Sequence, residues 1–371
     1  MLPEKKRVRG LGADEVFDFR VGDPHVPAPP AVNEAIRALL LECDGTALHG
    51  YTPAPGLPSL RKAVAADLRA RCGAPVSADG IYVCCGAEAG LAACCRGLLC
   101  PGEEALVFAP FSPEYRAFVE GAGGELGVVP AAGGLAPDLE VLERRLGERT
   151  KLLILNTPNA CSGVALPAES LARIGELLQA AERRFNRTIY LVADESCREL
   201  VYDGTLPPSA LGFYDDAILC ASFSLPGERI GCLAVSDRAA QKADVFDALA
   251  GAARAIGYVN PPSLMQRVVE RCLGQRPDLS VWRESRDLLC TGLAELGFDC
   301  VRPDAAFYLF IKSPEPDAGA FSERAKQYGL LLAAGDEFGL GGYARLACCV
   351  PTDRIRRSMP AFRALAESYG L

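Results

Sequence analysis

Four side chains that can do chemistry stand just beyond two short apolar runs. Asp194 follows the run Ile189–Ala193, and the Ser222-Phe223-Ser224 segment follows the run Ala217–Ala221, with Arg229 shortly after it. Each run is too short for a typical helix and is bounded by polar or turn residues, so each is predicted to be a buried parallel strand. Because the carboxyl ends of strands face the ligand crevice in an open α/β sheet, we expect a carboxylate, two hydroxyls and a guanidinium to meet in one pocket.

A glycine turn near residue 86 offers an anion-binding feature. Gly86-Ala87-Glu88-Ala89-Gly90 links an apolar run, Ile81–Cys85, to a helical pattern that extends to about Leu99. A turn of this kind presents free backbone N–H groups and the positive end of a helix dipole to an anion. Close packing of the helix on the sheet explains the glycines equally well, so the motif alone is weak. Glu88 would repel a phosphate unless its side chain turned away.

Seven strand-like runs predict the sheet that positions these residues. They alternate with helical patterns, which indicates an α/β fold with a mostly parallel sheet. The runs are Ile81–Cys85, Ala105–Phe108, Leu126–Val129, Lys151–Asn156, Ile189–Ala193, Ala217–Ala221 and Arg229–Val235.

The last part of the chain changes to an α+β pattern. Strands are expected at Ala306–Ile311, Leu330–Ala333 and Tyr343–Val350, with a helix near Ala318–Tyr328 and a last helix capped by Thr352. At 371 residues the chain is long for a single core, so two domains are expected. We predict a large domain of residues 45–260 and a small domain that joins residues 1–44 to 261–371.

Four motifs resemble those of the class I/II pyridoxal-phosphate aminotransferases, which have the aspartate-aminotransferase fold (fold type I). The family's D-E-x-Y and S-F-S-K-x-x-x-x-P-G-x-R-x-G correspond to Asp194–Cys197 and Ser222–Gly231. Its N-x-P-x-N-P-[ST]-G and Y-x-x-x-x-G-x-x-x-L-R correspond to Asn156–Gly163 and Tyr51–Arg61. The resemblance extends from about Phe17 to the end of the chain. It implies a three-layer sandwich with a seven-stranded, mostly parallel sheet, plus a smaller α/β domain.

The resemblance also implies which residues bind the cofactor, pyridoxal phosphate. The aspartate keeps the pyridine nitrogen protonated. The tyrosine of the Y-x-x-x-x-G-x-x-x-L-R motif reaches into the partner subunit's site and touches the cofactor phosphate. The alternative is that this tyrosine, in a loop rich in glycine and proline, only packs against its neighbours. The implied cofactor-binding residues are Gly86, Ala87, Asp194, Ser222, Ser224, Arg229 and Tyr51.

Four departures from the family pattern concern the cofactor. About four residues, including the Schiff-base lysine, are missing between Ser224 and Leu225, so the catalytic residue is unknown. Ser112, the expected N-cap of a helix that starts at Pro113, replaces a ring that stacks on the pyridine. Two donors to the phenolic oxygen are also replaced. They correspond to Ala160 and Cys197. Two lost hydrogen bonds and a lost stacking contact sum to roughly 4–7 kcal/mol, so we expect doubtful binding of pyridoxal phosphate, and no internal aldimine.

Two further residues are implied to bind the substrate. Arg345, in Tyr343-Ala344-Arg345-Leu346-Ala347, matches the arginine that holds the substrate carboxylate as a bidentate pair. Gly22, in an arm rich in proline as far as Pro30, matches the glycine that approaches the same carboxylate. A surface arginine and a plain Gly-Asp-Pro turn are the alternatives.

The composition excludes several other classes. A net charge of −8 gives no reason to expect a nucleic-acid partner. No apolar run approaches the ~20 residues of a membrane helix and no signal peptide is evident, so a cytoplasmic protein is expected. The sixteen cysteines include adjacent pairs in apolar segments, and there are only two histidines. We therefore expect neither a disulfide framework nor a metal site.

Two functions remain open. One is an active aminotransferase that uses a displaced lysine, of which Lys242 is the nearest in sequence. The other is an impaired family member, a pseudoenzyme that binds an amino-acid or oxo-acid ligand or serves as a partner subunit. The number of departures around one ligand favours the second. In either case the resemblance implies a homodimer.

Overall fold

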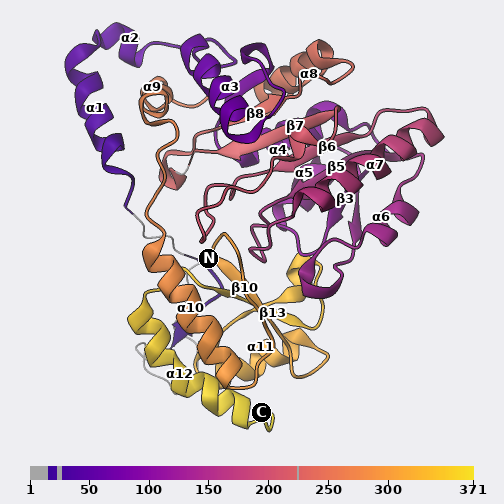
Figure 1. Cartoon of the computed structure of the whole chain (residues 1–371), viewed down its shortest axis with the longest axis vertical. Coiled ribbons are helices and arrows are strands. Elements are labelled where there is room, and N and C mark those ends of the chain that lie inside the picture. The colour runs from indigo at the N-terminus through magenta and orange to yellow at the C-terminus, as the bar shows by residue number, and fades with distance from the viewer. Residues whose placement is uncertain (1–15, 23–26, 224) are drawn as a thin grey trace.

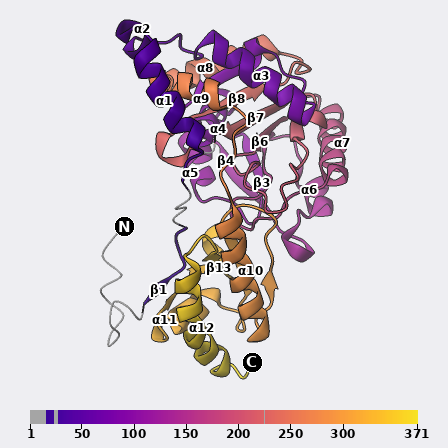
Figure 2. The same ribbon diagram turned by 60° about the vertical axis from the view of Figure 1, so that its left-hand side comes forward.

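The computed structural model describes residues 16–22, 27–223 and 225–371. In Figure 1 the described chain forms two bodies, one above the other. The large body contains a seven-stranded sheet, and the small body contains a four-stranded sheet from the C-terminal part of the chain. The turned view in Figure 2 shows the same arrangement, with the small body below the large one.

The large sheet is mostly parallel, as predicted. Its order is β2-β8-β7-β6-β5-β3-β4, and β8 alone runs antiparallel to the other six strands. Each strand lies where an apolar run predicts one, with ends that differ by one or two residues. The strands are β2 (Ile81–Cys84), β3 (Glu104–Phe108), β4 (Glu125–Val129), β5 (Thr150–Asn156), β6 (Tyr190–Asp194), β7 (Ala217–Ser222) and β8 (Gly231–Val235).

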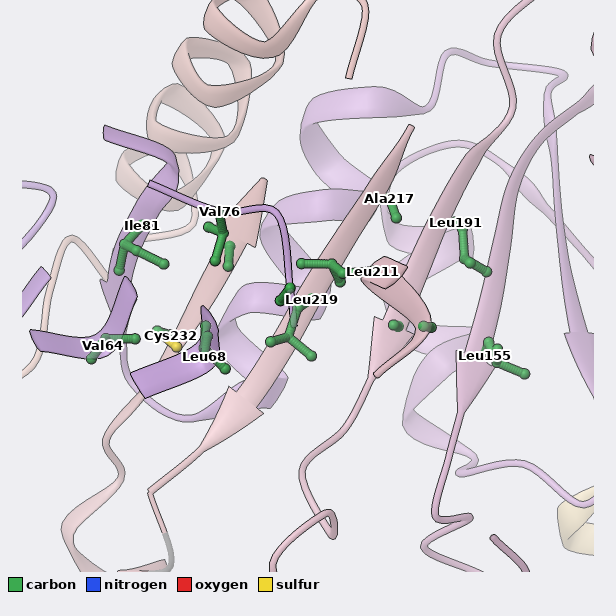
Figure 3. Close-up of a cluster of buried hydrophobic side chains, with 14 of the residues drawn as sticks. Val64, Leu68, Val76, Ile81, Leu155, Leu191, Leu211, Ala217, Leu219 and Cys232 are labelled. Atoms are coloured by element: carbon green, nitrogen blue, oxygen red, sulfur yellow. The ribbon is translucent and has the colours of Figure 1, made fainter. Parts of the chain in front are cut away.

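Both faces of the large sheet are buried, because successive side chains of a strand point to opposite faces. Leu191 packs into the core on one face, while Val192 packs into the core on the other. Figure 3 shows part of the first core, in which Leu191, Leu219, Cys232 and Ile81 follow one another across four adjacent strands. A strand that is buried on both sides must be apolar throughout, and this explains the continuous apolar runs of the sequence.

Helices cover both faces, so the large body is a three-layer sandwich and the predicted fold class is confirmed. One core includes residues of α1 (Pro30–Glu42), α2 (Gly45–His49), α3 (Pro58–Cys72), α6 (Leu139–Arg145), α7 (Ala168–Phe185) and α9 (Ser263–Cys272). The other core includes residues of α4 (Ala87–Leu98), α5 (Glu114–Gly121) and α8 (Lys242–Ala255).

The small body packs three helices on a small antiparallel sheet. Its helices are α10 (Ser280–Glu295), α11 (Ala318–Gln327) and α12 (Thr352–Glu367), and α10 and α12 lie side by side (Figure 1). The sheet has the order β12-β13-β10-β9, and the N-terminal β1 joins this body by pairing with β11. These strands are β1 (Phe17–Asp18), β9 (Cys300–Val301), β10 (Tyr308–Lys312), β11 (Leu330–Leu331), β12 (Ala333–Ala334) and β13 (Tyr343–Ala347).

Two predicted helix caps are wrong. α12 begins at Thr352 itself, and the preceding Pro351 is its N-cap without a side-chain hydrogen bond. α5 begins at Glu114, with Pro113 as its N-cap. The hydroxyl of Ser112 donates to the carboxylate of Glu114 instead of accepting from a helix N–H. In both cases the N-cap position holds a proline, whose side chain has no oxygen that could accept from a helix N–H.

Candidate functional site

A cavity of about 310 Å³ lies where the carboxyl ends of β6 and β7 meet the start of α4. It contains five of the seven residues predicted to bind the cofactor. These are Gly86, Ala87, Asp194, Ser222 and Arg229. Because parallel strands end at the same edge of the sheet, residues that are far apart in the chain come together there. We call this space the ligand cavity.

A buried carboxylate forms one wall of the ligand cavity. Asp194 is 5% exposed and ends β6. Its Oδ2 accepts a hydrogen bond from the Tyr115 hydroxyl at 2.5 Å, and its Oδ1 accepts one from the backbone N–H of Ser196 at 3.0 Å. Burial raises the pKa of Asp194, and the two hydrogen bonds oppose that rise because they favour the charged form. Asp194 can therefore hold a proton or a cationic ring nitrogen.

Tyr115 is a functional residue that the sequence reasoning missed. Its ring is 2% exposed, and burial raises the pKa of its phenol well above its ordinary value, so it stays a hydrogen-bond donor. The one sequence signal was its place one helical turn beyond Ser112, in the segment after β3.

An anion cradle forms the opposite part of the cavity. Gly86 has a φ of +83°, a conformation that favours glycine, and it precedes the first turn of α4. The N–H of Ala87 donates to the Ser222 hydroxyl at 3.1 Å. Arg229 lies above the turn, where its Nη2 would be 3.4 Å from a Cβ at Gly86. A backbone N–H, a hydroxyl and a guanidinium therefore converge, as phosphate sites require.

Glu88 lies beside the anion cradle, and its negative charge is paired with a cation there. Its carboxylate pairs with Arg229 at 2.7 Å, and both side chains are more than half exposed. An exposed pair of this kind is weak, so a doubly charged anion can compete for the guanidinium.

Three small side chains line the ligand cavity at the positions where the sequence departs from the family pattern. They are Ser112, Ala160 and Cys197. Burial raises the pKa of Cys197 to about 12, so it is a neutral thiol there. Trp282 and Phe307, which the sequence reasoning also missed, line the cavity as well, with their rings edge to face at 5.2 Å.

No lysine is among the described residues that line the cavity. Lys242, the nearest in sequence to the gap, pairs with Asp79 at 2.7 Å and Asp237 at 2.8 Å. Asp237 lies beyond the end of β8, which pairs with the start of β7, whereas Ser222 lies at the opposite end of β7. A strand of this length separates Lys242 from the cavity by roughly 15 Å.

The two residues predicted to bind the substrate come together outside the ligand cavity. Arg345 on β13 lies between two rings, 3.8 Å from the Tyr308 centroid and 3.9 Å from the Phe338 centroid. The N–H of Gly22 donates to the Tyr308 hydroxyl at 3.0 Å. A Cβ at Gly22 would lie 2.8 Å from the Cys349 sulfur, so the close approach requires glycine. Tyr308 joins both predicted residues and was also missed.

Of the other two residues predicted to bind the cofactor, Ser224 lies outside the described residues. Tyr51 is fully exposed and lines a separate hollow with His49, Thr52 and Asn260. Within one chain it therefore lies away from Asp194, and the prediction that it serves a partner's site stays a prediction.

Other features of the described residues add no competing site. They contain no cluster of three histidine, cysteine, aspartate or glutamate side chains that could hold a metal ion. None of their helices combines the length and apolar character needed to cross a membrane. All sixteen cysteines are free thiols.

Comparison with known proteins links the chain and its fold to one family. The family model described as aminotransferase class I and II matches residues 14–362. The probable aspartate/prephenate aminotransferase of Thermus aquaticus is 30% identical over 374 residues, covering 96% of this chain and 92% of that protein. An LL-diaminopimelate aminotransferase of Desulforudis audaxviator is 28% identical over 383 residues, covering 96% and 91%.

Solved structures agree with the sequence comparison. An amino transferase from Eubacterium rectale superimposes with a TM-score of 0.96 at 40% identity, covering 99% of this chain and 94% of that one. The Thermus thermophilus aspartate aminotransferase with maleate superimposes with a TM-score of 0.83 at 27% identity, covering 95% and 92%. The seven-stranded sandwich of this chain is therefore shared with these solved structures.

Proposed function

The chain belongs to the class I and II aminotransferase family, and we propose that its ligand cavity corresponds to the family's cofactor site but is impaired for ordinary transamination. One observation carries this proposal. The cavity brings together Asp194, Ser222 and Arg229, which fit the cofactor, while no described lysine lines it. The relatives' names point to amino acids and their oxo acids as the ligand class.

The residues of the cavity fit a phosphorylated pyridine ring in part. Ala87, Ser222 and Arg229 would hold the phosphate, because the first turn of α4 and the guanidinium both favour an anion. Asp194 would hold the ring nitrogen, and Tyr115 would keep its carboxylate in place. Bound there, pyridoxal phosphate would supply an electron-withdrawing ring. Covalent attachment does not fit, because the described residues that line the cavity offer no lysine amine.

Impairment is supported by the small residues around the cavity. Ser112 offers no ring to stack on the cofactor, and Ala160 and Cys197 offer neither an amide nor a phenol to its phenolic oxygen. Asn156, which could donate an amide, is engaged elsewhere. Its Nδ2 donates to the carbonyl of Asp194 at 2.9 Å. The described residues that line the cavity include no lysine or histidine that could move a proton at the substrate's α-carbon.

The alternative, an active enzyme with a displaced lysine, has less support. Lys242 would have to leave two carboxylates and cross the length of β7. A non-catalytic role as a binding protein or partner subunit needs no such movement, and we favour this role.

A cofactor experiment tests the proposal. The protein is incubated with pyridoxal phosphate, its absorbance spectrum is recorded, and the sample is reduced with borohydride for mass spectrometry. We expect no visible-wavelength lysine adduct and no trapped adduct at Lys242. A stoichiometric adduct would instead favour the active enzyme.

A repair experiment separates the missing lysine from the other departures. A segment with the family's lysine is inserted after Ser224, with and without three further replacements, and half-reaction rates are measured with a panel of amino acids. We expect the insertion alone to leave activity low, because a misplaced ring plane disfavours proton transfer. Equal rates for the two proteins would contradict this. The three replacements are Ser112→Phe, Ala160→Asn and Cys197→Tyr.

We propose that the protein is a homodimer, which the full exposure of Tyr51 supports. A large domain of residues 45–260 and a small domain of residues 1–44 with 261–371 stay a prediction, and the packing of α1 and α9 on the large-sheet core favours assigning these helices to the large domain. A cytoplasmic location likewise stays a prediction.

A further inference from the structure

The wall of the ligand cavity carries an excess of negative charge. Among the described lining residues, Glu88, Glu114 and Asp194 are carboxylates and Arg229 is the one cationic side chain. Arg229 is paired with Glu88. Glu114 and Asp194 form no ion pair with the described residues. A ligand that carries a positive charge as well as a phosphate would therefore suit this cavity better than one that carries the phosphate alone.

Glu114 and Asp194 lie on the same wall of the cavity. Glu114 is the first residue of α5, and the next residue, Tyr115, reaches Asp194 with its hydroxyl. The carboxylate of Glu114 accepts from the Ser112 hydroxyl, at the position where the family pattern has a ring. Glu114 is exposed to solvent, and among the described residues its carboxylate accepts a side-chain hydrogen bond from Ser112 alone.

Two common forms of the cofactor differ in one substituent. Pyridoxal phosphate carries an aldehyde, and pyridoxamine phosphate carries an aminomethyl group that is cationic near neutral pH. The aldehyde gains attachment by condensing with a lysine amine, which the described lining residues lack. The amine needs no covalent partner. It needs a hydrogen-bond acceptor of negative charge.

We propose that the ligand cavity preferentially binds the amine form of the cofactor, pyridoxamine phosphate, and that the carboxylate of Glu114 accepts from its ammonium group. This inference rests on the proposed function, since it assumes that the cavity corresponds to the family's cofactor site. The phosphate would occupy the anion cradle of Ala87, Ser222 and Arg229, and the ring nitrogen would face Asp194. Binding is non-covalent, so no bond forms or breaks.

Calorimetric titration tests the inference directly. The full-length protein is titrated with pyridoxamine phosphate and with pyridoxine phosphate, which carries a neutral hydroxymethyl group in place of the aminomethyl group. We expect pyridoxamine phosphate to bind roughly tenfold or more tightly, the ratio typical of one hydrogen bond to a charged group. Equal or weaker binding of the amine would overturn the inference.

A matched pair of variants assigns the preference to one side chain. Glu114→Gln should bring the affinity ratio of the two ligands close to one by weakening pyridoxamine phosphate alone. Glu120→Gln, on the same helix, removes an exposed carboxylate that pairs with Arg116 and does not line the cavity. It should leave the ratio unchanged. If the affinity ratio of the two ligands were unchanged in Glu114→Gln, the proposed role of Glu114 would be overturned.

Failure of the inference and failure of the proposed function look different. If neither ligand binds, both are contradicted, because the cavity then accepts no form of the cofactor. If both bind with similar affinity, and Arg229→Gln weakens both, the proposed cofactor site is supported and only the amine preference is wrong.

Discussion

Replacing Tyr115 with phenylalanine should raise the pKa of Asp194. The change removes one hydroxyl, which donates to Asp194 Oδ2 at 2.5 Å, and keeps the ring that fills the core. A hydrogen bond to a charged group is worth about 1.5–3 kcal/mol. Since one pKa unit corresponds to about 1.4 kcal/mol, the pKa of Asp194 should rise by about 1–2 units. The N–H of Ser196 would remain as its donor.

The same variant should lose stability in a pH-dependent way. Burial already raises the pKa of Asp194, so above its unfolded-state pKa the folded protein binds more protons than the unfolded chain, and stability falls as pH rises until the folded-state pKa is passed. A further rise in the folded-state pKa extends that fall. The variant should therefore be less stable than the parent by about 1.5–3 kcal/mol where Asp194 is charged in the parent, and by less at low pH, where it is protonated in both.

Two measurements check this prediction. Carboxyl-carbon NMR titration of aspartate-labelled protein, with the resonance assigned by Asp194→Asn, measures the pKa directly, and denaturant unfolding at several pH values measures stability. Tyr202→Phe is the matched control, because the Tyr202 hydroxyl is buried but donates to the neutral carbonyl of Ala306 at 2.6 Å. Its loss of stability should not change with pH over the same range. An Asp194 pKa that stayed constant or fell in Tyr115→Phe would refute the reasoning.

Three further predictions concern other parts of the molecule. Gly163→Ala should lower the free energy of unfolding by at least about 2 kcal/mol, because the φ of Gly163 is +73° and the new Cβ would lie 2.2 Å from Pro303. Gly204→Ala is the control, with a φ of +80° and no atom within 4 Å of the new Cβ, and it should lower the free energy of unfolding by only about 1–2 kcal/mol. Equal losses in the two variants would contradict the predicted clash with Pro303. Lys242→Met should leave the absorbance spectrum with pyridoxal phosphate unchanged. It should lower the free energy of unfolding, measured with denaturant, by roughly 0.5–1 kcal/mol, because two ion pairs are lost. Loss of an absorbance band in this variant would favour a catalytic role for Lys242. Light scattering at micromolar concentration should give twice the chain mass of 39.3 kDa, and Tyr51→Ala should weaken that association; a monomer would contradict the predicted homodimer.

The amino-acid sequence by itself determined the large sheet and one edge of the site. Parallel strands buried on both faces must be apolar throughout, and such runs are legible without a structure. The same pattern predicts which residues lie at the edge of the sheet, because the polar residue that ends an apolar run must lie where the strand leaves the core. Asp194, Ser222 and Arg229 were identified in this way, and they line one cavity. The sequence also predicted that the family's lysine is missing, from a gap in an otherwise regular motif, and this stays a prediction.

Only the tertiary structure decided which side chains meet at this edge. The Tyr115 hydroxyl reaches a carboxylate 79 positions away, and Tyr308 meets Gly22 across 286 positions. Such contacts depend on how helices and loops pack on the sheet, and a local pattern of apolar and polar residues carries no information about that packing. The same reason explains why Glu114, an exposed residue at a helix start, could not be recognised as part of the cavity wall. The cavity forms only when the sheet is assembled, because its other lining residues come from strand ends and from the start of α4.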